Sequence, residues 1–169
     1  MYLRQTEAPQ SLYTPEERRR RDASPWTLVQ GILAPVQFAA FLISLWLVLR
    51  FLATGEGLAI ATASVVVKTL FLYAIMITGS LWERDVFGRY LFAPAFYWED
   101  VVSMLVLALH TAYLMTLTMK TVNAEHQMYL ALAAYAAYVV NATQFLLKLR
   151  AARQQGGALS GAVSAGGAE

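Results

Sequence analysis

Four long apolar segments divide this sequence and restrict the folds that the chain can adopt. Lys68 is the only charged residue within them, and they run from Thr27 to Leu49, from Leu58 to Leu81, from Val101 to Met119 and from Gln127 to Leu147. A helix crosses the hydrocarbon core of a bilayer in roughly 20 residues, so each segment is long enough, or nearly so, to span it. Backbone groups in lipid must bond to one another, so each span is expected to be helical. We therefore predict an all-α, integral membrane four-helix bundle, with spans at about residues 27–53, 58–81, 99–119 and 127–148.

The composition supports a membrane protein and removes several kinds of chemistry. Charged residues make up 14% of the 169 residues, whereas a soluble domain usually carries about 25%. Cysteine is absent, which excludes disulfides, thiolate metal sites and cysteine nucleophiles. The sequence also lacks a Gly-rich phosphate loop, an HExxH zinc motif, a haem attachment motif and a nucleophile elbow. An enzyme that depends on a nucleotide or on haem is therefore disfavoured.

Outside the four spans, the chain divides into a basic arm and a tail of small residues. Residues 1–24 form the polar arm, residues 25–153 the transmembrane domain, and residues 154–169 a tail rich in Gly, Ala and Ser that we expect to be disordered. Within the arm, Thr14, Pro15 and Glu17 match a helix start with a capping box, and four arginines follow at 18–21. The arm is therefore either a short basic helix against anionic lipid headgroups or a disordered basic tail.

The distribution of Lys and Arg predicts the orientation of the chain in the membrane. Ten of these residues, from Arg4 to Arg153, lie in the arm, in the connection between the second and third spans, and at the C-terminal end. The two short turns carry only Arg50 and Lys120. The positive-inside rule therefore places both termini and the middle connection in the cytoplasm.

Polar or small side chains form a stripe along each span. A helix turns about 100° per residue, so residues seven or eleven apart lie on nearly the same face. The stripes are Gln30, Gln37 and Ser44; Ser64, Lys68, Ile75 and Gly79; Glu99, Ser103 and His110, with Tyr113 close by; and Ala134, Ala137, Asn141, Gln144 and Lys148. Because polar groups are costly in lipid, we expect the four stripes to face one another inside the bundle. Packing between helices is the favoured role for the amide and hydroxyl side chains.

Lys68 and His110 are ionisable residues near the middle of their spans. Lys68 is too deep to reach the membrane surface easily, so we expect it to pair with an acid or to bind a ligand. His110 shares a face with Glu99, which allows two interpretations, a buried hydrogen-bonding residue or a functional one. Glu99 and Asp100 could also serve only to start the third helix, since acids favour helix N-termini.

The connection from Trp82 to Asp100 is the most distinctive segment of the sequence. It holds seven aromatic residues and six charged ones. One interpretation is an aromatic belt at the interface between membrane and water. The other is a binding platform for a flat, apolar ligand with a carboxylate, in which the aromatic side chains stack on the plane of the ligand. Arg84 or Arg89 would then bind the carboxylate.

Six stretches of the sequence together form a specific pattern. They read YTPEERRRRDAS at 13–24, WTLVQG at 26–31, VKT at 67–69, GSLWE at 79–83, FGRYLFAPAFYWEDVVS at 87–103 and LHTAY at 109–113. The pattern resembles the 3-vinyl bacteriochlorophyllide hydratase family, also called 2-vinyl bacteriochlorophyllide hydratase, over roughly residues 13–153. The resemblance implies hydration of the C3-vinyl group of chlorophyllide a, or of 3-vinyl bacteriochlorophyllide a, to a 3-(1-hydroxyethyl) group in bacteriochlorophyll biosynthesis.

The same resemblance implies the setting of the reaction. The enzyme would be a hydro-lyase in the bacterial inner membrane, including the intracytoplasmic photosynthetic membrane. It would need no cofactor, because the substrate carries its own magnesium. Its partners would be the chlorophyllide and the lipid bilayer, with contacts to other bacteriochlorophyll-synthesis enzymes and none to nucleic acid. The sequence does not predict an oligomeric state.

The chemistry of the reaction suggests which residues carry it. Water adds to an alkene after a proton reaches the terminal carbon, so the site needs a buried acid and an acceptor for the attacking water. We expect Glu99 or Glu83 to be the acid and Asp100 or Asp85 the acceptor. His110 would act as an acid or relay, or would ligate the magnesium of the substrate. The expected substrate contacts are Lys68, Arg84, Arg89, Trp82, Tyr97, Trp98, Ser103 and Asn141.

Two other functions compete with this hypothesis. The polar stripes and His110 would also suit a non-enzymatic pigment-binding or assembly subunit of a photosynthetic membrane complex. A small transporter built around Lys68 is the third hypothesis, but the two halves of the sequence show no repeat. Turnover of the pigment separates the first hypothesis from the second.

Overall fold

The computed structural model describes residues 12–166, with side chains described as far as Gln154. Its helices are α1 (Pro15–Ala23), α2 (Pro25–Thr54), α3 (Leu58–Phe87), α4 (Tyr97–Met119) and α5 (Ala124–Gly166). By length and composition, α2, α3, α4 and α5 could each cross a membrane. The prediction of an all-α protein with four candidate spans is therefore confirmed, and these helices indicate a multi-pass membrane protein.

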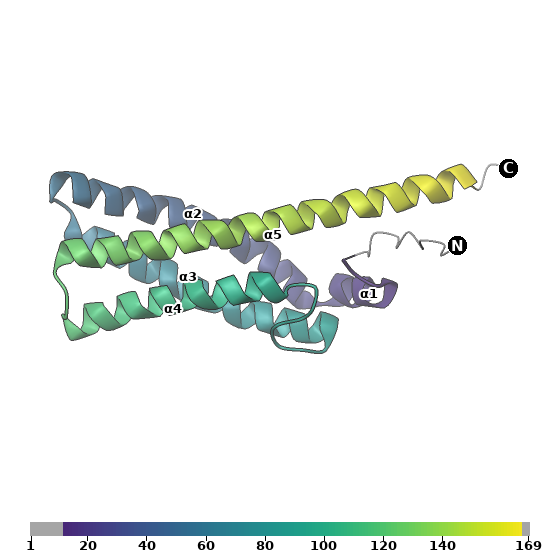
Figure 1. Ribbon diagram of the computed structural model, residues 1–169, viewed down its shortest axis with the longest axis horizontal. Coiled ribbons are helices and arrows are strands. Elements are labelled where there is room, and N and C mark those ends of the chain that lie inside the picture. Colours follow the sequence, from purple (N-terminus) through teal and green to yellow (C-terminus); the bar gives the residue numbers. More distant parts are fainter. Residues whose placement is uncertain (1–11, 167–169) are drawn as a thin grey trace, which may run out of the picture.

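The four long helices pack as two neighbouring pairs (Figure 1). α2 lies along α3 and α4 lies along α5, while α2 also contacts α5 and α3 also contacts α4. The short α1 lies at one end of the bundle, against α3. Large apolar side chains cover much of the outer surface, including Leu28, Ile43, Trp46, Leu70, Ile77, Leu105 and Leu146. An apolar exterior around buried polar groups is the arrangement that a lipid environment favours.

The basic arm contains a capped helix, as one of its two interpretations predicts. The Glu17 backbone N–H donates to Thr14 Oγ1 at 3.2 Å, and the Thr14 backbone N–H donates to Glu17 Oε2 at 2.8 Å. These reciprocal bonds pair two N–H groups that the helix itself cannot pair. Residues 1–11 of the predicted arm, with Arg4, lie outside the described residues.

Two helices run beyond the ends that the sequence predicts. α3 continues from the predicted end at 81 to Phe87, because the residue that stops it is Gly88, whose φ of 75° is left-handed. The segment Trp82–Phe87 is therefore helix rather than connection. α5 continues through Gly166, into the tail that the sequence predicts to be disordered, and no proline interrupts it.

The polar stripes face one another, as predicted. Ser44 of α2 bonds to Ser64 of α3 at 2.7 Å and to the Tyr135 hydroxyl of α5 at 2.6 Å. Asn141 Nδ2 of α5 donates to Ser103 Oγ of α4 at 2.8 Å. These bonds cross between helices, so they align the bundle as well as pairing polar groups that lipid would not solvate.

Replacing Gly88 with alanine tests the role of the turn that ends α3. Gly88→Ala forces a side chain into a left-handed conformation, although nothing lies within 4 Å of the new Cβ, and should cost about 1 kcal/mol of stability. Gly31→Ala is the matched control, because Gly31 lies inside α2 and also has nothing within 4 Å. Thermal unfolding in detergent should show a lower Tm for Gly88→Ala alone. An equal loss in both variants would contradict this account of the turn.

Candidate functional site

Three buried acids meet at one end of the bundle, and we call Glu83, Glu99 and Asp100 the acid cluster. Glu83 comes from the last turns of α3, and Glu99 and Asp100 come from the first turn of α4. Their exposed fractions are 5%, 7% and 3%. Acidic side chains are rarely buried to this degree unless they are paired, so the partners of each one define the chemistry of the site.

The loop between α3 and α4 supplies backbone donors to two of the acids. The Ala93 N–H donates to Glu83 Oε2 at 3.2 Å, and the Phe92 N–H donates to Asp100 Oδ2 at 2.7 Å. Phe92 has a φ of 59°, a left-handed conformation that is uncommon for residues other than glycine. The bond to Asp100 offsets the cost of this conformation and fixes the loop over the cluster.

Glu83 and Asp100 form a carboxyl pair. Their side chains lie within hydrogen-bonding range of each other. An ionised carboxylate only accepts hydrogen bonds, so a bond between two carboxyl groups requires one of them to hold a proton. A proton shared by Glu83 and Asp100 would be held away from water, because both side chains are buried.

The third acid has a cationic partner. Lys148 Nζ of α5 lies 2.6 Å from Glu99 Oε2, and it also lies 4.9 Å from the centroid of the Phe96 ring. The ammonium group compensates for the charge of a buried carboxylate. Glu99 is thus the partner of Lys148 and does not belong to the carboxyl pair. Lys148 is a site residue that the sequence pattern placed only on a polar stripe.

Aromatic rings pack beside the acid cluster in two groups. The first, which we call the aromatic cluster, is an interior group of Tyr13, Trp82, Phe87, Phe96 and Phe145, with ring centroids 5.7–6.4 Å apart in the contacting pairs. The second, the exposed aromatic patch, is formed by Tyr90, Phe92, Tyr97 and Trp98. Phe92 connects the exposed patch to the acid cluster, because its ring lies 5.8 Å from that of Tyr97 and its N–H donates to Asp100.

The predicted contact residues divide between these groups. Tyr97 and Trp98 lie on the exposed patch, with their ring centroids 5.5 Å apart. Trp82 instead packs inward, and its Nε1 donates to Thr27 Oγ1 at 2.9 Å. Arg84 and Arg89 are exposed, and the Arg84 guanidinium lies 5.1 Å from the centroid of the Tyr90 ring.

Asp85 does not join the acid cluster. Its side chain is exposed, and its Oδ2 accepts from Ser24 Oγ at 2.8 Å. The reason is helical geometry: two residues along a helix correspond to a rotation of about 200°, so Asp85 and Glu83 point to opposite sides of α3. The structure therefore does not bring Asp85 together with the other predicted acids.

Lys68 and His110 lie deeper in the bundle, with no exposed surface. Lys68 Nζ lies 3.8 Å from the centroid of the Tyr138 ring, and within the described residues it has no hydrogen-bond or acid partner, so the predicted ion pair does not form. His110 Nδ1 lies 2.8 Å from the Val106 carbonyl and must therefore carry the proton, which leaves Nε2 without a partner in the same part of the chain. That nitrogen is the one that could ligate a metal carried by a substrate.

The acid cluster and the deep residues are separate sites. Asp100 and His110 are ten residues apart on α4, which corresponds to roughly 15 Å along a helix. Ser103 and Asn141, which bond to each other, lie between these levels. One reacting atom therefore cannot touch both Asp100 and His110.

Comparison with known proteins gives a consistent result. The family model for 2-vinyl bacteriochlorophyllide hydratase matches residues 13–151. A protein of Rhodobacter capsulatus named 2-vinyl bacteriochlorophyllide hydratase is 63% identical over 151 residues, which cover 89% of this chain and 88% of that protein. A protein of Cereibacter sphaeroides with the same name is 66% identical over 142 residues, 84% of this chain and 88% of that protein. No solved structure matches the chain.

The ion pair between Lys148 and Glu99 can be tested by a double-mutant cycle. Lys148→Met leaves a buried carboxylate without its cation and should destabilise the protein by about 2 kcal/mol. Adding Glu99→Gln to Lys148→Met removes the unpaired charge and should restore most of the stability. Thermal unfolding in detergent measures both values. If the losses of stability in the single variants Lys148→Met and Glu99→Gln simply add in the double variant, the pair does not stabilise the site.

Proposed function

This chain belongs to the 2-vinyl bacteriochlorophyllide hydratase family, and we propose that it hydrates the vinyl group of its substrate at the acid cluster. The substrate is chlorophyllide a or 3-vinyl bacteriochlorophyllide a, and the product carries a 3-(1-hydroxyethyl) group used in bacteriochlorophyll biosynthesis. The activity named for relatives 63% and 66% identical to this chain supports this reaction. The enzyme is therefore a hydratase of the carbon–oxygen lyase class, and the only metal that we propose in the reaction is the magnesium of the substrate.

The carboxyl pair is the observation that supports the proposed mechanism. The proton of the pair bonds to the terminal vinyl carbon as the π bond of the vinyl group breaks. A cation remains on the carbon attached to the macrocycle. The conjugated ring spreads this charge. Water then bonds to the cationic carbon and gives one proton back to the pair, so the net change is the addition of one water and the acid is regenerated.

The partners of each acid decide the proposed roles. Glu83 is the proton donor, because it contacts Asp100 and, within the described residues, forms no ion pair, whereas Glu99 pairs with Lys148. Asp100 accepts the proton of the attacking water. Glu99 is a positioning residue, and Asp85 has no direct role, because it faces away from the cluster.

The exposed aromatic patch is the proposed contact for the macrocycle. Tyr97 and Trp98 offer flat apolar surfaces, and Tyr97 lies 5.8 Å from the ring of Phe92, whose N–H donates to Asp100. We place the macrocycle at the level of the acid cluster, roughly 15 Å along α4 from His110, and therefore assign His110 no contact with its magnesium. Lys68, His110, Ser103 and Asn141 then act as the internal polar packing of the bundle.

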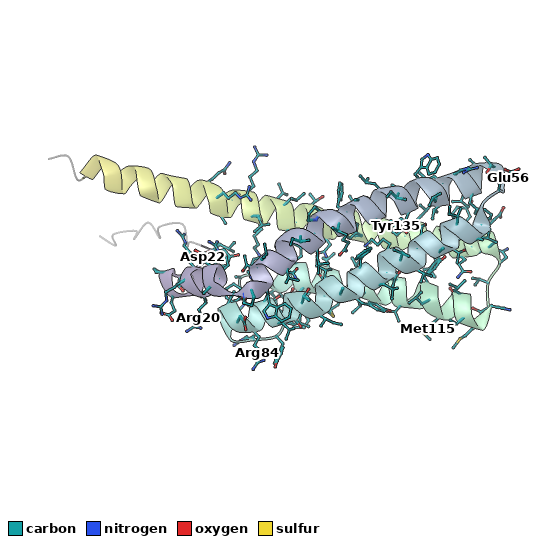
Figure 2. The ribbon with its side chains drawn as sticks, turned by 180° about the vertical axis from the view of Figure 1, so that it is seen from behind. Arg20, Asp22, Glu56, Arg84, Met115 and Tyr135 are labelled. Carbon is teal, nitrogen blue, oxygen red and sulfur yellow. The ribbon has the colours of Figure 1, made fainter. Side chains whose placement is uncertain are left out.

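The proposed orientation follows from the charges at the two ends of the bundle. Arg20 and Arg84 lie at one end, while Glu56 lies at the other (Figure 2). The positive-inside rule supports a cytoplasmic location for the first end, which holds the acid cluster. We propose that both termini are cytoplasmic and that the protein lies in the bacterial inner membrane, including its intracytoplasmic photosynthetic regions, where it can contact other enzymes of the same pathway.

Removing the proposed proton donor should abolish most of the turnover. Glu83→Gln keeps the shape and the hydrogen bond from the loop but cannot donate the same proton, so kcat should fall by about 10²-fold or more. Asp85→Asn is the control, because Asp85 lies on the opposite side of α3 and should leave kcat unchanged. Membranes with each variant are incubated with chlorophyllide a, and the pigment is followed for a product heavier by one water. Full turnover by Glu83→Gln would overturn the assignment, and a pigment that the wild type binds but never changes would overturn the proposed reaction.

The exposed aromatic patch should affect binding more than chemistry. Trp98→Ala removes a stacking surface present in both the ground state and the transition state, so KM should rise about tenfold with little change in kcat. Trp46→Ala is the matched control, since Trp46 is exposed to a similar degree, 61% against 69%, but lies on α2. Steady-state kinetics in nanodiscs give both values. Equal KM values for the two variants would exclude the patch as the contact surface.

A further inference from the structure

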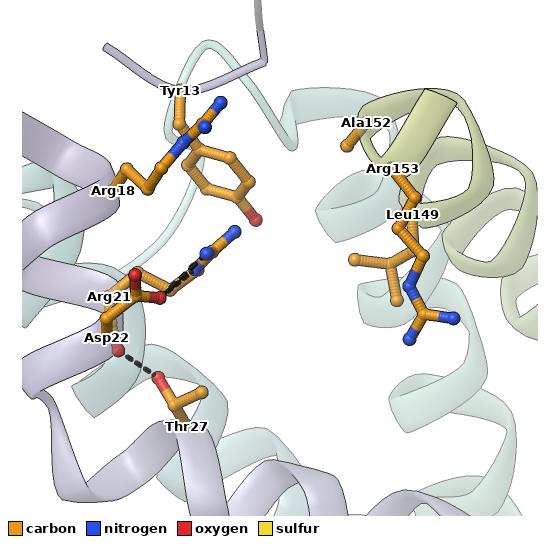
Figure 3. Close-up of a pocket in the computed structure, with 8 residues that line it drawn as sticks. All are labelled: Tyr13, Arg18, Arg21, Asp22, Thr27, Leu149, Ala152 and Arg153. Carbon is orange, nitrogen blue, oxygen red and sulfur yellow. Dashed lines mark hydrogen bonds and ion pairs between the residues drawn. The ribbon is translucent and has the colours of Figure 1, made fainter. Parts of the chain in front are cut away.

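A basic cavity lies beside the aromatic cluster, between α1, the start of α2 and the distal part of α5 (Figure 3). Its volume is about 440 Å³, and it is lined by Tyr13, Arg18, Arg21, Asp22, Thr27, Leu149, Ala152 and Arg153. Arg18 and Arg21 approach from one side and Arg153 from the other. Two helices distant in sequence, α1 and α5, thus bring three guanidinium groups around one space.

The charges of this cavity are not balanced. Arg21 is paired with Asp22, at 2.7 Å from Nη2 to Oδ1, and its guanidinium lies 5.0 Å from the centroid of the Tyr13 ring. Neither Arg18 nor Arg153 forms an ion pair with any residue in the described part of the chain. Burial raises the pKa of the Tyr13 hydroxyl, so the phenol stays neutral and adds no negative charge. Two positive charges are therefore left uncompensated around the cavity.

One layer of aromatic rings separates the cavity from the acid cluster. The Tyr13 ring stacks on Phe87 at 5.9 Å and lies 6.4 Å from Phe96. The Phe96 ring in turn contacts Lys148, the partner of Glu99. The walls of the cavity are apolar where Tyr13, Leu149 and Ala152 line it, so a bound ion would be less screened than at an open surface.

We propose that this cavity binds one oxyanion, a carboxylate or a phosphate, between Arg18 and Arg153. Guanidinium groups bind both anions with paired, directional hydrogen bonds. Two sources can present such a group at this end of the bundle. One is the free propionate of the chlorophyllide, which rests on the proposed function, and the other is the headgroup phosphate of an anionic lipid, which does not.

The substrate source is tested by binding rather than by turnover. Chlorophyllide a and its propionate methyl ester are titrated against the full-length protein in phosphatidylcholine nanodiscs, with quenching of tryptophan fluorescence as the signal. For the double variant Arg18→Gln with Arg153→Gln, the Kd for the free acid should rise about tenfold or more, while the Kd for the ester stays as in the wild type. The control is Arg19→Gln with Arg20→Gln, two exposed arginines that pair with Glu16 outside the cavity. Because the readout is binding, the result does not depend on whether the vinyl group is hydrated.

The lipid source is tested by thermal stability in nanodiscs. Phosphatidylglycerol in place of phosphatidylcholine should raise the Tm of the wild type and of the control, and the cavity variant should lose this rise. A higher Kd for the free acid in the cavity variant alone supports an oxyanion site for the propionate. Loss of the lipid-dependent rise in Tm in the cavity variant alone supports a site for the lipid phosphate. The site is ruled out if the cavity variant keeps both the wild-type affinity for the free acid and the full lipid effect, or if the control loses as much as the cavity variant.

Discussion

The cost of burying polar groups inside an apolar bundle is the constraint on which most of the contacts between these helices depend. Lipid offers no hydrogen bonds, so Ser44, Ser64 and Tyr135 bond to one another across three helices. The same requirement brings Lys148 to Glu99 and turns the loop N–H groups of Phe92 and Ala93 towards the acids. The candidate site is therefore part of the fold, because the same requirement positions both the helices and the buried carboxyl groups.

The sequence predicted the parts of the site that depend on helical periodicity within a span. Spacings of seven and eleven residues identified faces that do contact one another, such as Asn141 with Ser103 and Lys148 with Glu99. Asp85 was grouped with the other acids because Trp82–Phe87 was treated as a connection, which has no defined faces, and the structure does not bring these residues together. Once that segment is recognised as part of α3, the rotation of about 100° per residue is enough to place Asp85 and Glu83 on opposite sides of the helix.

Other parts could not be predicted from one sequence, because they depend on tertiary packing. The basic cavity combines Arg18 with Arg153, residues 135 positions apart, through the angle at which α1 meets the bundle. The distribution of Lys and Arg predicts that both arginines lie near the cytoplasmic surface, but it does not predict that they line the same cavity. The distance between Asp100 and His110 was available from helical rise, yet only the exposed and buried faces of the folded chain show which level lies beside the aromatic patch.

The hydrogen bond from the Phe92 N–H to Asp100 connects the charge of one carboxyl group to the shape of the loop above it. A carboxylate is a stronger acceptor than a neutral carboxyl group, so the bond is strongest while Asp100 is ionised. In the proposed mechanism Asp100 takes a proton from the attacking water, which would weaken this bond and leave the left-handed backbone of Phe92 less compensated. The loop conformation would then be less stable once the alcohol has formed, and this change would link release of the product to completion of the reaction.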